Sequence, residues 1–200
     1  QLELTRTAYQ NKFIRKNGKI RGDYQGAYVM ALTYVVTEET LRRKMLGYLI
    51  RDIRKNGLNT GFFATEHLLP LLADHGESRL AYDLLLQENC PGWMYEIKKG
   101  ATTVWERWDA IRPDGSVNEA KSGGDNMVSF NHYAFGSVGE FYYRYILGIR
   151  PLEPGYRKAL IRPYPDVRLG SVSGSYASVN GRIAVAWKYT GKEEVSISAE

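Results

Sequence analysis

The chain has 200 residues and a formal net charge of +5, from 27 basic and 22 acidic side chains. Its hydrophobic fraction of 44% is ordinary for a globular protein, so a disordered or fibrous chain is excluded. No apolar run approaches the roughly 20 residues that a membrane span requires. The basic residues form short clusters that we expect on solvated helix faces. Without a continuous basic face we predict no nucleic-acid partner.

The first 150 residues predict helices in pairs. The expected helices cover residues 2–14, 24–36, 38–56, 61–74, 77–88 and 131–147. The second is apolar nearly all round, as a buried helix is, and the third is amphipathic. Thr37 is the predicted N-cap of the third helix, and Asn56-Gly57 is its predicted end. Alternating buried and amphipathic helices favour antiparallel hairpins, of which a closed ring covers every apolar flank.

At most three such pairs are visible, about half of a six-hairpin ring. The chain also begins without methionine and stops inside a predicted strand at Glu200. We therefore expect a piece of a longer protein, and its compartment stays unknown. Its open apolar flank predicts a covering neighbour, either the missing N-terminal half or a second copy in a homo-oligomer.

After residue 150 the pattern changes to β structure. Four prolines between Pro151 and Pro165 predict a linker. Asn180-Gly181 is a strong hairpin signal, and residues 182–190 alternate apolar and polar as a half-buried strand does. We predict a domain over residues 1–150 and a truncated antiparallel β domain over 151–200.

Aromatic and polar side chains gather between Pro91 and His132. Trp93, Trp105 and Trp108 accompany the carboxylates Glu106 and Asp109, and Asn131 and His132 follow at the head of the predicted 131–147 helix. Aromatic walls with few polar groups suit sugars, which present C–H faces and hydroxyls. The polar, Gly-rich residues 111–126 predict a loop over this site.

Each residue also has an ordinary structural interpretation. Trp105 and Trp108 are spaced as a buried helix stripe would be, and Glu106 beside Arg107 could be a surface ion pair. Asn131 and His132 could simply cap and start a helix. The clustering of all these residues in one loop-rich segment favours the site. No Cys/His set with metal spacing, phosphate loop or G-x-S-x-G pattern is present, so we predict no metal and no cofactor. Cys90, as the single cysteine, allows no internal disulfide.

The runs GATTVWERWD (Gly100–Asp109) and SFNHYAFGSVGE (Ser129–Glu140) resemble the bacterial alpha-L-rhamnosidase family of glycoside hydrolases. Further similar stretches are YQGAYVMAL from Tyr24, NTGFFATEHLLPLLADHG from Asn59, LAYDLLLQENCPGW from Leu80 and GIRPLEPGYRKALIRP from Gly148. The resemblance implies a six-hairpin α/α toroid followed by a C-terminal β-sandwich. It also implies inverting hydrolysis of terminal L-rhamnose from a carbohydrate substrate.

In that family the glutamate of the WERW motif is the general base and the histidine of NHY contacts the sugar. These roles fall on Glu106 and His132. From the clustering in the sequence we predict Asn131, Asp109, Trp93, Trp105 and Trp108 as further substrate contacts. The family's acid lies upstream, in an acidic segment with no counterpart here, and the nearest substitutes are Glu66, Asp74 and Asp109. We therefore expect the full-length parent to be active and this piece alone to be inactive.

Two other classes of function remain open. Another α/α-toroid glycosidase or lyase could present a similar aromatic cleft, and its products on a panel of aryl glycosides would distinguish it. A non-catalytic carbohydrate-binding protein could keep the aromatics and His132 without a working acid. An acidic motif upstream of Gln1 would favour the enzyme over such a binder.

Overall fold

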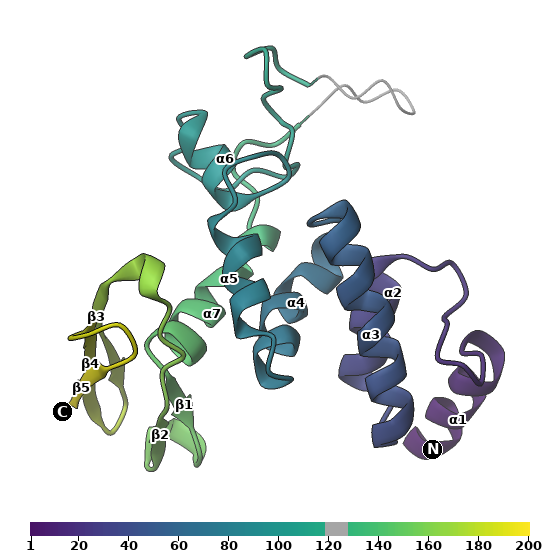
Figure 1. Cartoon of the computed structure of the whole chain (residues 1–200), viewed down its shortest axis with the longest axis horizontal. Helices are drawn as coiled ribbons and strands as arrows, with labels where there is room; N and C mark the ends of the chain where they lie inside the picture. Colours follow the sequence, from purple (N-terminus) through teal and green to yellow (C-terminus); the bar gives the residue numbers. More distant parts are fainter. Residues whose placement is uncertain (119–127) are drawn as a thin grey trace. The chain divides into compact units, whose positions relative to one another are not determined.

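The structure, a computed structural model, describes residues 1–118 and 128–200. These residues form two compact units, Gln1–Gly136 and Ser137–Glu200. The first unit is mainly helical, and the β-strands that Figure 1 labels lie in the second unit. The predicted order of a helical part before a C-terminal antiparallel β part is therefore confirmed. The predicted division at residue 150 stays a prediction, and the expected 111–126 loop lies partly outside the described residues.

The helices of the first unit follow the predicted order. They are α1 (Leu2–Phe13), α2 (Gln25–Tyr34), α3 (Glu39–Asn56), α4 (Phe62–Asp74), α5 (Ser78–Leu86) and α6 (Trp93–Lys98). The first five confirm predicted helices to within three residues at each end, whereas α6 was not predicted. Short loops join α2 to α3 and α4 to α5, and each of these pairs packs together. This is the helical-hairpin arrangement expected for part of a toroid.

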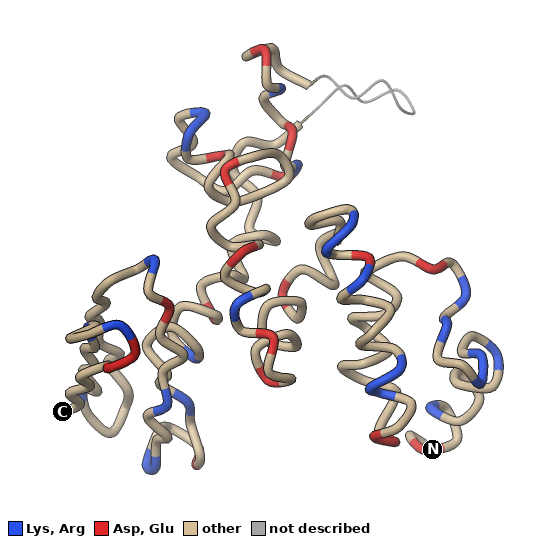
Figure 2. Tube along the Cα trace, in the orientation of Figure 1, with Lys and Arg blue, Asp and Glu red and all other residues tan. Residues whose placement is uncertain are grey.

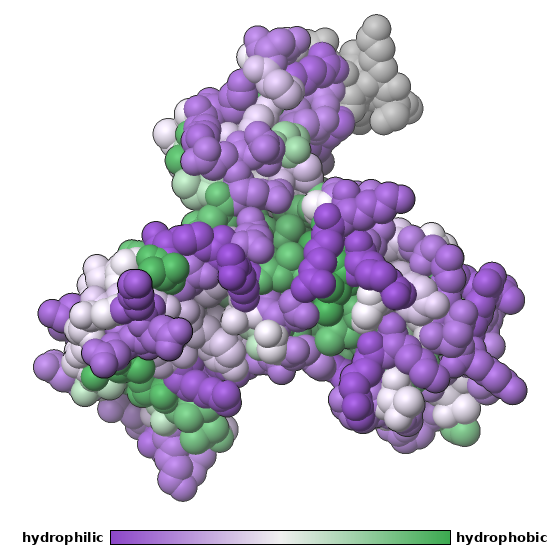
Figure 3. All heavy atoms as spheres, in the orientation of Figure 1, coloured by the Kyte–Doolittle hydropathy of each residue, from purple (hydrophilic) through white to green (hydrophobic). Residues whose placement is uncertain are grey.

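Helices α2 and α3 differ in how much of their surface is buried. Ala27, Val29 and Leu32 of α2 are buried on different sides of the helix, because almost every position in it is apolar. Helix α3 buries one face, on which Met45 and Leu49 are four residues apart. Apolar atoms also gather over the region of α4 and α5 on the face that Figure 3 shows.

The opposite face of α3 carries the predicted basic cluster. Figure 2 shows Lys and Arg along α3 and along the segment after α1, with Asp and Glu among them. Arg43 lies 3.4 Å from Glu39, and Arg54 lies 3.2 Å from Glu77. Both arginines are exposed, as expected for a solvated outer face.

The N-cap of α3 is Glu38, and the prediction of Thr37 is wrong. The two carboxylate oxygens of Glu38 accept the backbone N–H groups of Thr40 at 2.7 Å and Leu41 at 2.6 Å. A charged acceptor stabilises these N–H groups and the positive end of the helix dipole better than a hydroxyl does, and these bonds lower the pKa of Glu38. At the other end Gly57 adopts a φ of +69°, which confirms the predicted stop.

The prediction of one continuous helix over residues 131–147 is also wrong. The structure has a 3-10 turn η1 (Ala134–Ser137), a short α7 (Val138–Phe141) and a π-helical turn η2 (Tyr142–Ile146). The backbone N–H of His132 donates to the carbonyl of Val104 at 2.8 Å, so this residue is paired with another segment. Asn131 is therefore not a helix cap, and His132 lies two residues before the first helical turn.

The second unit contains two antiparallel sheets. Strand β1 (Ile149–Pro151) pairs with β2 (Ala159–Ile161), and β3 (Ser171–Ser178), β4 (Gly181–Tyr189) and β5 (Val195–Ala199) form a three-stranded sheet in that order. The predicted hairpin is confirmed, because Ser178 pairs with Gly181 across a two-residue turn. The prediction of a linker from Pro151 to Pro165 is wrong, since this stretch includes β2 and the 3-10 turn η3 (Pro154–Tyr156).

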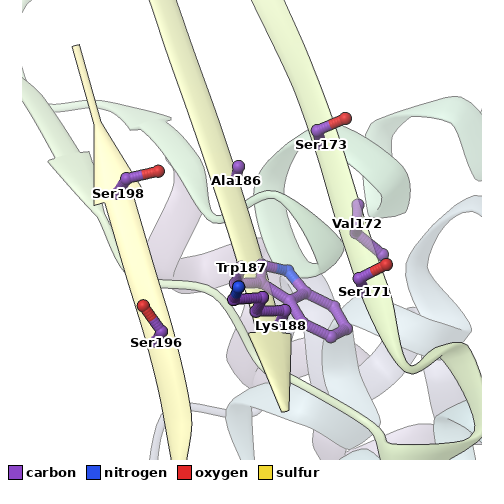
Figure 4. A pocket seen from close by; sticks show the side chains of 8 residues that line it. All are labelled: Ser171, Val172, Ser173, Ala186, Trp187, Lys188, Ser196 and Ser198. Carbon is purple, nitrogen blue, oxygen red and sulfur yellow. The ribbon is translucent and has the colours of Figure 1, made fainter. Parts of the chain in front are cut away.

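The two faces of the three-stranded sheet differ in side-chain size. Val185 and Trp187 of β4 are each 2% exposed, and the Trp187 indole N–H donates to the carbonyl of Ile146 at 2.7 Å. On β3 and β5, short side chains line a shallow hollow (Figure 4). These are Ser171, Ser173, Ser196 and Ser198. The predicted alternation along β4 is confirmed, and its apolar side forms the core of this unit.

Candidate functional site

The two motifs singled out in the sequence run side by side in the first unit. The backbone N–H of Glu106 donates to the carbonyl of Ser129 at 2.9 Å, and the N–H of His132 donates to the carbonyl of Val104 at 2.8 Å. Residues 104–106 therefore lie along residues 129–132 with opposite chain directions. Because of this pairing, Glu106 lies on the segment next to the one that carries Asn131 and His132.

The carboxylate of Glu106 is held from one side. Its Oε2 accepts the backbone N–H of Ser129 at 2.8 Å, and the side chain is half-buried. Among the residues that the structure describes, Oε1 has no hydrogen-bond partner. A carboxylate fixed through one oxygen can accept a proton from water at the other.

Arg107 does not pair with Glu106, so the surface ion pair that sequence adjacency suggests does not form. Its Nε lies 3.3 Å from Oδ1 of Asp109. The other oxygen of Asp109 accepts the side-chain amide of Asn118 at 2.5 Å, and Asn118 in turn accepts a hydrogen bond from Arg112 at 2.7 Å. Asp109 is thus engaged in a polar network of its own, and its role as a substrate contact stays a prediction.

Each of the three tryptophans contacts a phenylalanine near the paired segments. Trp105 is 2% exposed and meets Phe130 edge-on, with ring centroids 5.5 Å apart. Trp93 is 6% exposed and donates its indole N–H to the carbonyl of Phe135 at 2.9 Å. Trp108 stacks on Phe135 at 3.8 Å and contacts Trp93 edge-on at 5.0 Å. The rings of Trp93 and Trp105 are therefore covered by the chain itself, and their predicted role as sugar walls stays untested.

His132 is held between aromatic rings. Its imidazole stacks on Phe62 at 4.7 Å and on Tyr133 at 5.2 Å. Its Nδ1 accepts the backbone N–H of Ala134 at 3.3 Å, so a neutral imidazole carries its proton on Nε2. That arrangement makes Nε2 a hydrogen-bond donor. Asn131, which directly precedes His132, is exposed, and its backbone N–H donates to the hydroxyl of Ser129 at 3.2 Å.

Sequence reasoning missed the exposed aromatic residues around His132. Phe62 is 38% exposed, Phe130 is 37% exposed and Tyr133 is 88% exposed. Phe130 and Tyr133 lie inside the SFNHYAF run and could have been included on that ground. Phe62 lies 70 residues upstream, at the start of α4, and no local pattern connects it with His132.

A second missed residue is Glu96 of α6. It is 3% exposed, and its Oε2 accepts the backbone N–H of Trp105 at 3.3 Å. Its Oε1 is buried and has no partner among the described residues. Burial, which disfavours the charged form, raises the pKa of Glu96 to about 7.

Within residues 1–118 and 128–200, no group of three or more His, Cys, Asp or Glu side chains is placed to hold a metal ion. In the same residues, no helix has both the length and the apolarity to cross a membrane.

Comparison with known families matches almost the whole chain. The model of the bacterial alpha-L-rhamnosidase 6 hairpin glycosidase domain matches residues 1–146, and that of the bacterial alpha-L-rhamnosidase C-terminal domain matches residues 148–200. An alpha-L-rhamnosidase of Streptomyces avermitilis is 42% identical over 185 residues, which are 92% of this chain and 18% of the relative. One of Formosa agariphila is 37% identical over 185 residues, which are 90% of this chain and 19% of the relative.

Solved structures give the same result. The Streptomyces avermitilis alpha-L-rhamnosidase complexed with L-rhamnose superposes with a TM-score of 0.89 at 40% identity, covering 97% of this chain and 18% of that one. The alpha-L-rhamnosidase of Aspergillus terreus superposes with a TM-score of 0.90 at 31% identity, covering 98% and 22%. This chain spans about a fifth of the length of these relatives. With a family model matched over most of its residues, the chain belongs to the bacterial alpha-L-rhamnosidase family of glycoside hydrolases.

Proposed function

We propose that this chain is part of a larger alpha-L-rhamnosidase that hydrolyses terminal alpha-L-rhamnose with inversion, and that Glu106 is its general base. Family membership and the names of the relatives support the reaction class. The observation that supports the residue is the anchored carboxylate of Glu106, which is half-buried and fixed by Ser129.

An inverting glycosidase activates water with one carboxylate and protonates the leaving oxygen with another, about 6.5–9.5 Å away. The base must hold one rotamer so that its water meets the anomeric carbon in line. The backbone N–H of Ser129 fixes Oε2 of Glu106 and leaves Oε1 for that water. The neighbouring buried Trp105 excludes solvent from one side of this backbone.

The sugar would be bound mainly by the 129–132 segment. Nε2 of His132 is a donor toward a ring hydroxyl, and the exposed amide of Asn131 can both donate and accept. The exposed faces of Phe62 and Tyr133 offer an apolar surface for the C6 methyl of rhamnose. Trp93, Trp105 and Trp108 contact Phe130 and Phe135, which lie on either side of Asn131 and His132 in the chain.

The general acid, in this proposal, comes from another part of the full-length protein. Glu66 and Asp74 lie exposed on α4, and Asp109 is engaged with Asn118 and Arg107. The remainder of the six-hairpin ring would also cover the apolar surface of α4 and α5. The isolated chain would therefore lack half of the carboxylate pair.

The test is hydrolysis of an aryl alpha-L-rhamnoside by the full-length protein, followed by proton NMR during the first turnovers. Inversion releases β-L-rhamnose first, which then mutarotates. Initial release of the α anomer would exclude the inverting mechanism, and no hydrolysis would exclude the activity. The isolated 200-residue chain is assayed in parallel, and appreciable turnover by it would show that the acid lies within this chain.

A further inference from the structure

Glu96 is a buried carboxyl that the proposed reaction does not use. It lies on α6 with 3% of its surface exposed, so it cannot contact a substrate directly. Burying a carboxyl with one oxygen unpaired costs stability, and such groups are uncommon in folded proteins. The other oxygen and the backbone carbonyl of Glu96 each accept hydrogen bonds that hold neighbouring residues in place.

The contacts of Glu96 organise the loop that leads to the WERW motif. Its backbone carbonyl accepts the N–H groups of Lys99 and Ala101, each at 3.0 Å, where α6 ends. Its side chain then reaches the N–H of Trp105 at 3.3 Å. One residue thus connects both ends of the loop, and Gly100 allows the intervening turn with a φ of +85°.

The hydrogen bond from Trp105 fixes the Val104–Trp105 peptide, one peptide before the one that carries the Glu106 N–H. The Trp105 N–H is held by Glu96, and the next N–H, that of Glu106, is held by the carbonyl of Ser129 at 2.9 Å. Two consecutive amides are therefore fixed by different elements, α6 and the 129–132 segment. A shift at either anchor would move the backbone that carries the Glu106 carboxylate.

We propose that Glu96 is a positioning residue for Glu106, holding the Trp105–Glu106 backbone through its contact with the Trp105 N–H. This inference rests on the proposed role of Glu106 as base. It requires a hydrogen-bond acceptor at position 96. A negative charge is not required.

The test compares variants of the full-length protein by kcat and KM on an aryl alpha-L-rhamnoside, normalised to folded protein. Glu96→Met keeps the length of the side chain and removes the acceptor, and its kcat should fall roughly 10- to 100-fold with KM within about threefold. Glu96→Gln keeps an amide oxygen for the Trp105 N–H, and its kcat should stay within about threefold of wild type. If Glu96→Met does not fold, Glu96→Asp replaces it, because its shorter side chain cannot reach Trp105; the same loss of kcat is then expected.

The matched control is Gln25→Leu. Gln25 is 1% exposed, and its side-chain oxygen accepts the N–H of Asn59 at 2.9 Å, so this variant also loses a buried acceptor of a backbone N–H. It should lose stability with little change in kcat. Equal kcat values for Glu96→Met and Gln25→Leu, or failure of Glu96→Gln to retain activity, would overturn the proposal.

The Glu106→Gln background separates this inference from the proposed function. If Glu96 acts through Glu106, adding Glu96→Met to Glu106→Gln should lower kcat by less than about threefold. A further tenfold loss would show that Glu96 acts elsewhere. Full activity of Glu106→Gln alone would instead exclude Glu106 as the general base.

Discussion

Glu106 and Ser129 form a reciprocal pair: the Glu106 N–H donates to the Ser129 carbonyl at 2.9 Å, and the Ser129 N–H donates to the Glu106 carboxylate at 2.8 Å. The two residues are 23 positions apart in the chain. This one contact joins the WERW and NHY motifs and fixes the side chain proposed as the base. A charge-assisted bond from a backbone N–H is stronger than one between neutral groups, so its loss should be measurable in kcat.

Replacing Ser129 tests this anchor. Ser129→Pro removes the N–H that holds Oε2, and kcat should fall about tenfold or more because the carboxylate loses its fixed rotamer. Ser129→Ala keeps the N–H and should stay within about threefold of wild type. Steady-state kinetics on an aryl alpha-L-rhamnoside measure both, and equal kcat values for the two variants would show that the N–H contact does not matter.

His132 should contribute to binding of the sugar. His132→Ala removes the donor at Nε2, and kcat/KM should fall roughly 10- to 100-fold, the range for losing one good hydrogen bond to a substrate. Inhibition by free L-rhamnose should weaken in parallel. The control is His67→Ala, because the ring nitrogen of His67 contacts the hydroxyl of Tyr34 at 2.7 Å. Unchanged inhibition in His132→Ala would exclude the contact.

Phe62 should act by holding the imidazole ring. Phe62→Leu removes the ring that stacks on His132 at 4.7 Å while keeping an apolar side chain. The inhibition constant of L-rhamnose should rise about three- to tenfold. This rise is smaller than the one expected for His132→Ala, because His132 is still present. A matched control is Phe63→Leu. Phe63 is 82% exposed, so this replacement should leave the inhibition constant unchanged. Equal effects of the two variants would contradict this role.

Glu96 should make stability depend on pH. Burial raises its pKa to about 7, so the folded state binds this proton more tightly than the unfolded chain, whose carboxyl titrates near 4.5. The contribution of Glu96 to the free energy of unfolding is most favourable below pH 4.5. It is lost as the pH rises toward 7 and changes little above that. Glu96→Gln cannot ionise. The Tm of wild type relative to Glu96→Gln should therefore fall by a few degrees between pH 5 and pH 8. A difference in Tm that does not change with pH would contradict the raised pKa.

The β part offers a test of its core. Val185 is 2% exposed on β4, and Val185→Ala should destabilise the sheet by about 2 kcal/mol. Amides of β3, β4 and β5 should then exchange with deuterium about tenfold faster or more. Lys188→Ala, on an exposed position of the same strand, should leave exchange unchanged. Equal rates of amide exchange in Val185→Ala and Lys188→Ala would show that Val185 is not part of the core of this sheet.

Local patterns were enough to predict most of the fold. Helix α3 follows from its apolar stripe and from Gly57, and β4 follows from its alternation and from the Asn180-Gly181 pair at its start. These features depend on neighbouring residues only. The six-hairpin assignment depended on resemblance to the family, because this chain spans about a fifth of the length of its relatives.

Errors occurred where distant segments decide the local structure. Residues 131–133 have a helical pattern, but the N–H of His132 is bonded to Val104, 28 residues upstream, and the helix cannot include it. Glu96 is likewise buried and bonded to the N–H of Trp105, nine residues downstream, which no spacing in the sequence reveals. Phe62 reaches His132 only because α4 is packed in the helical unit.

The central claim is that Glu106 activates the water that attacks the sugar. Its most direct test is kcat of Glu106→Gln in the full-length protein on an aryl alpha-L-rhamnoside. This variant keeps the size of the side chain and an oxygen for the Ser129 N–H, so KM should stay within a fewfold of wild type. We predict a fall in kcat of about two orders of magnitude or more. Turnover close to that of wild type would contradict the claim.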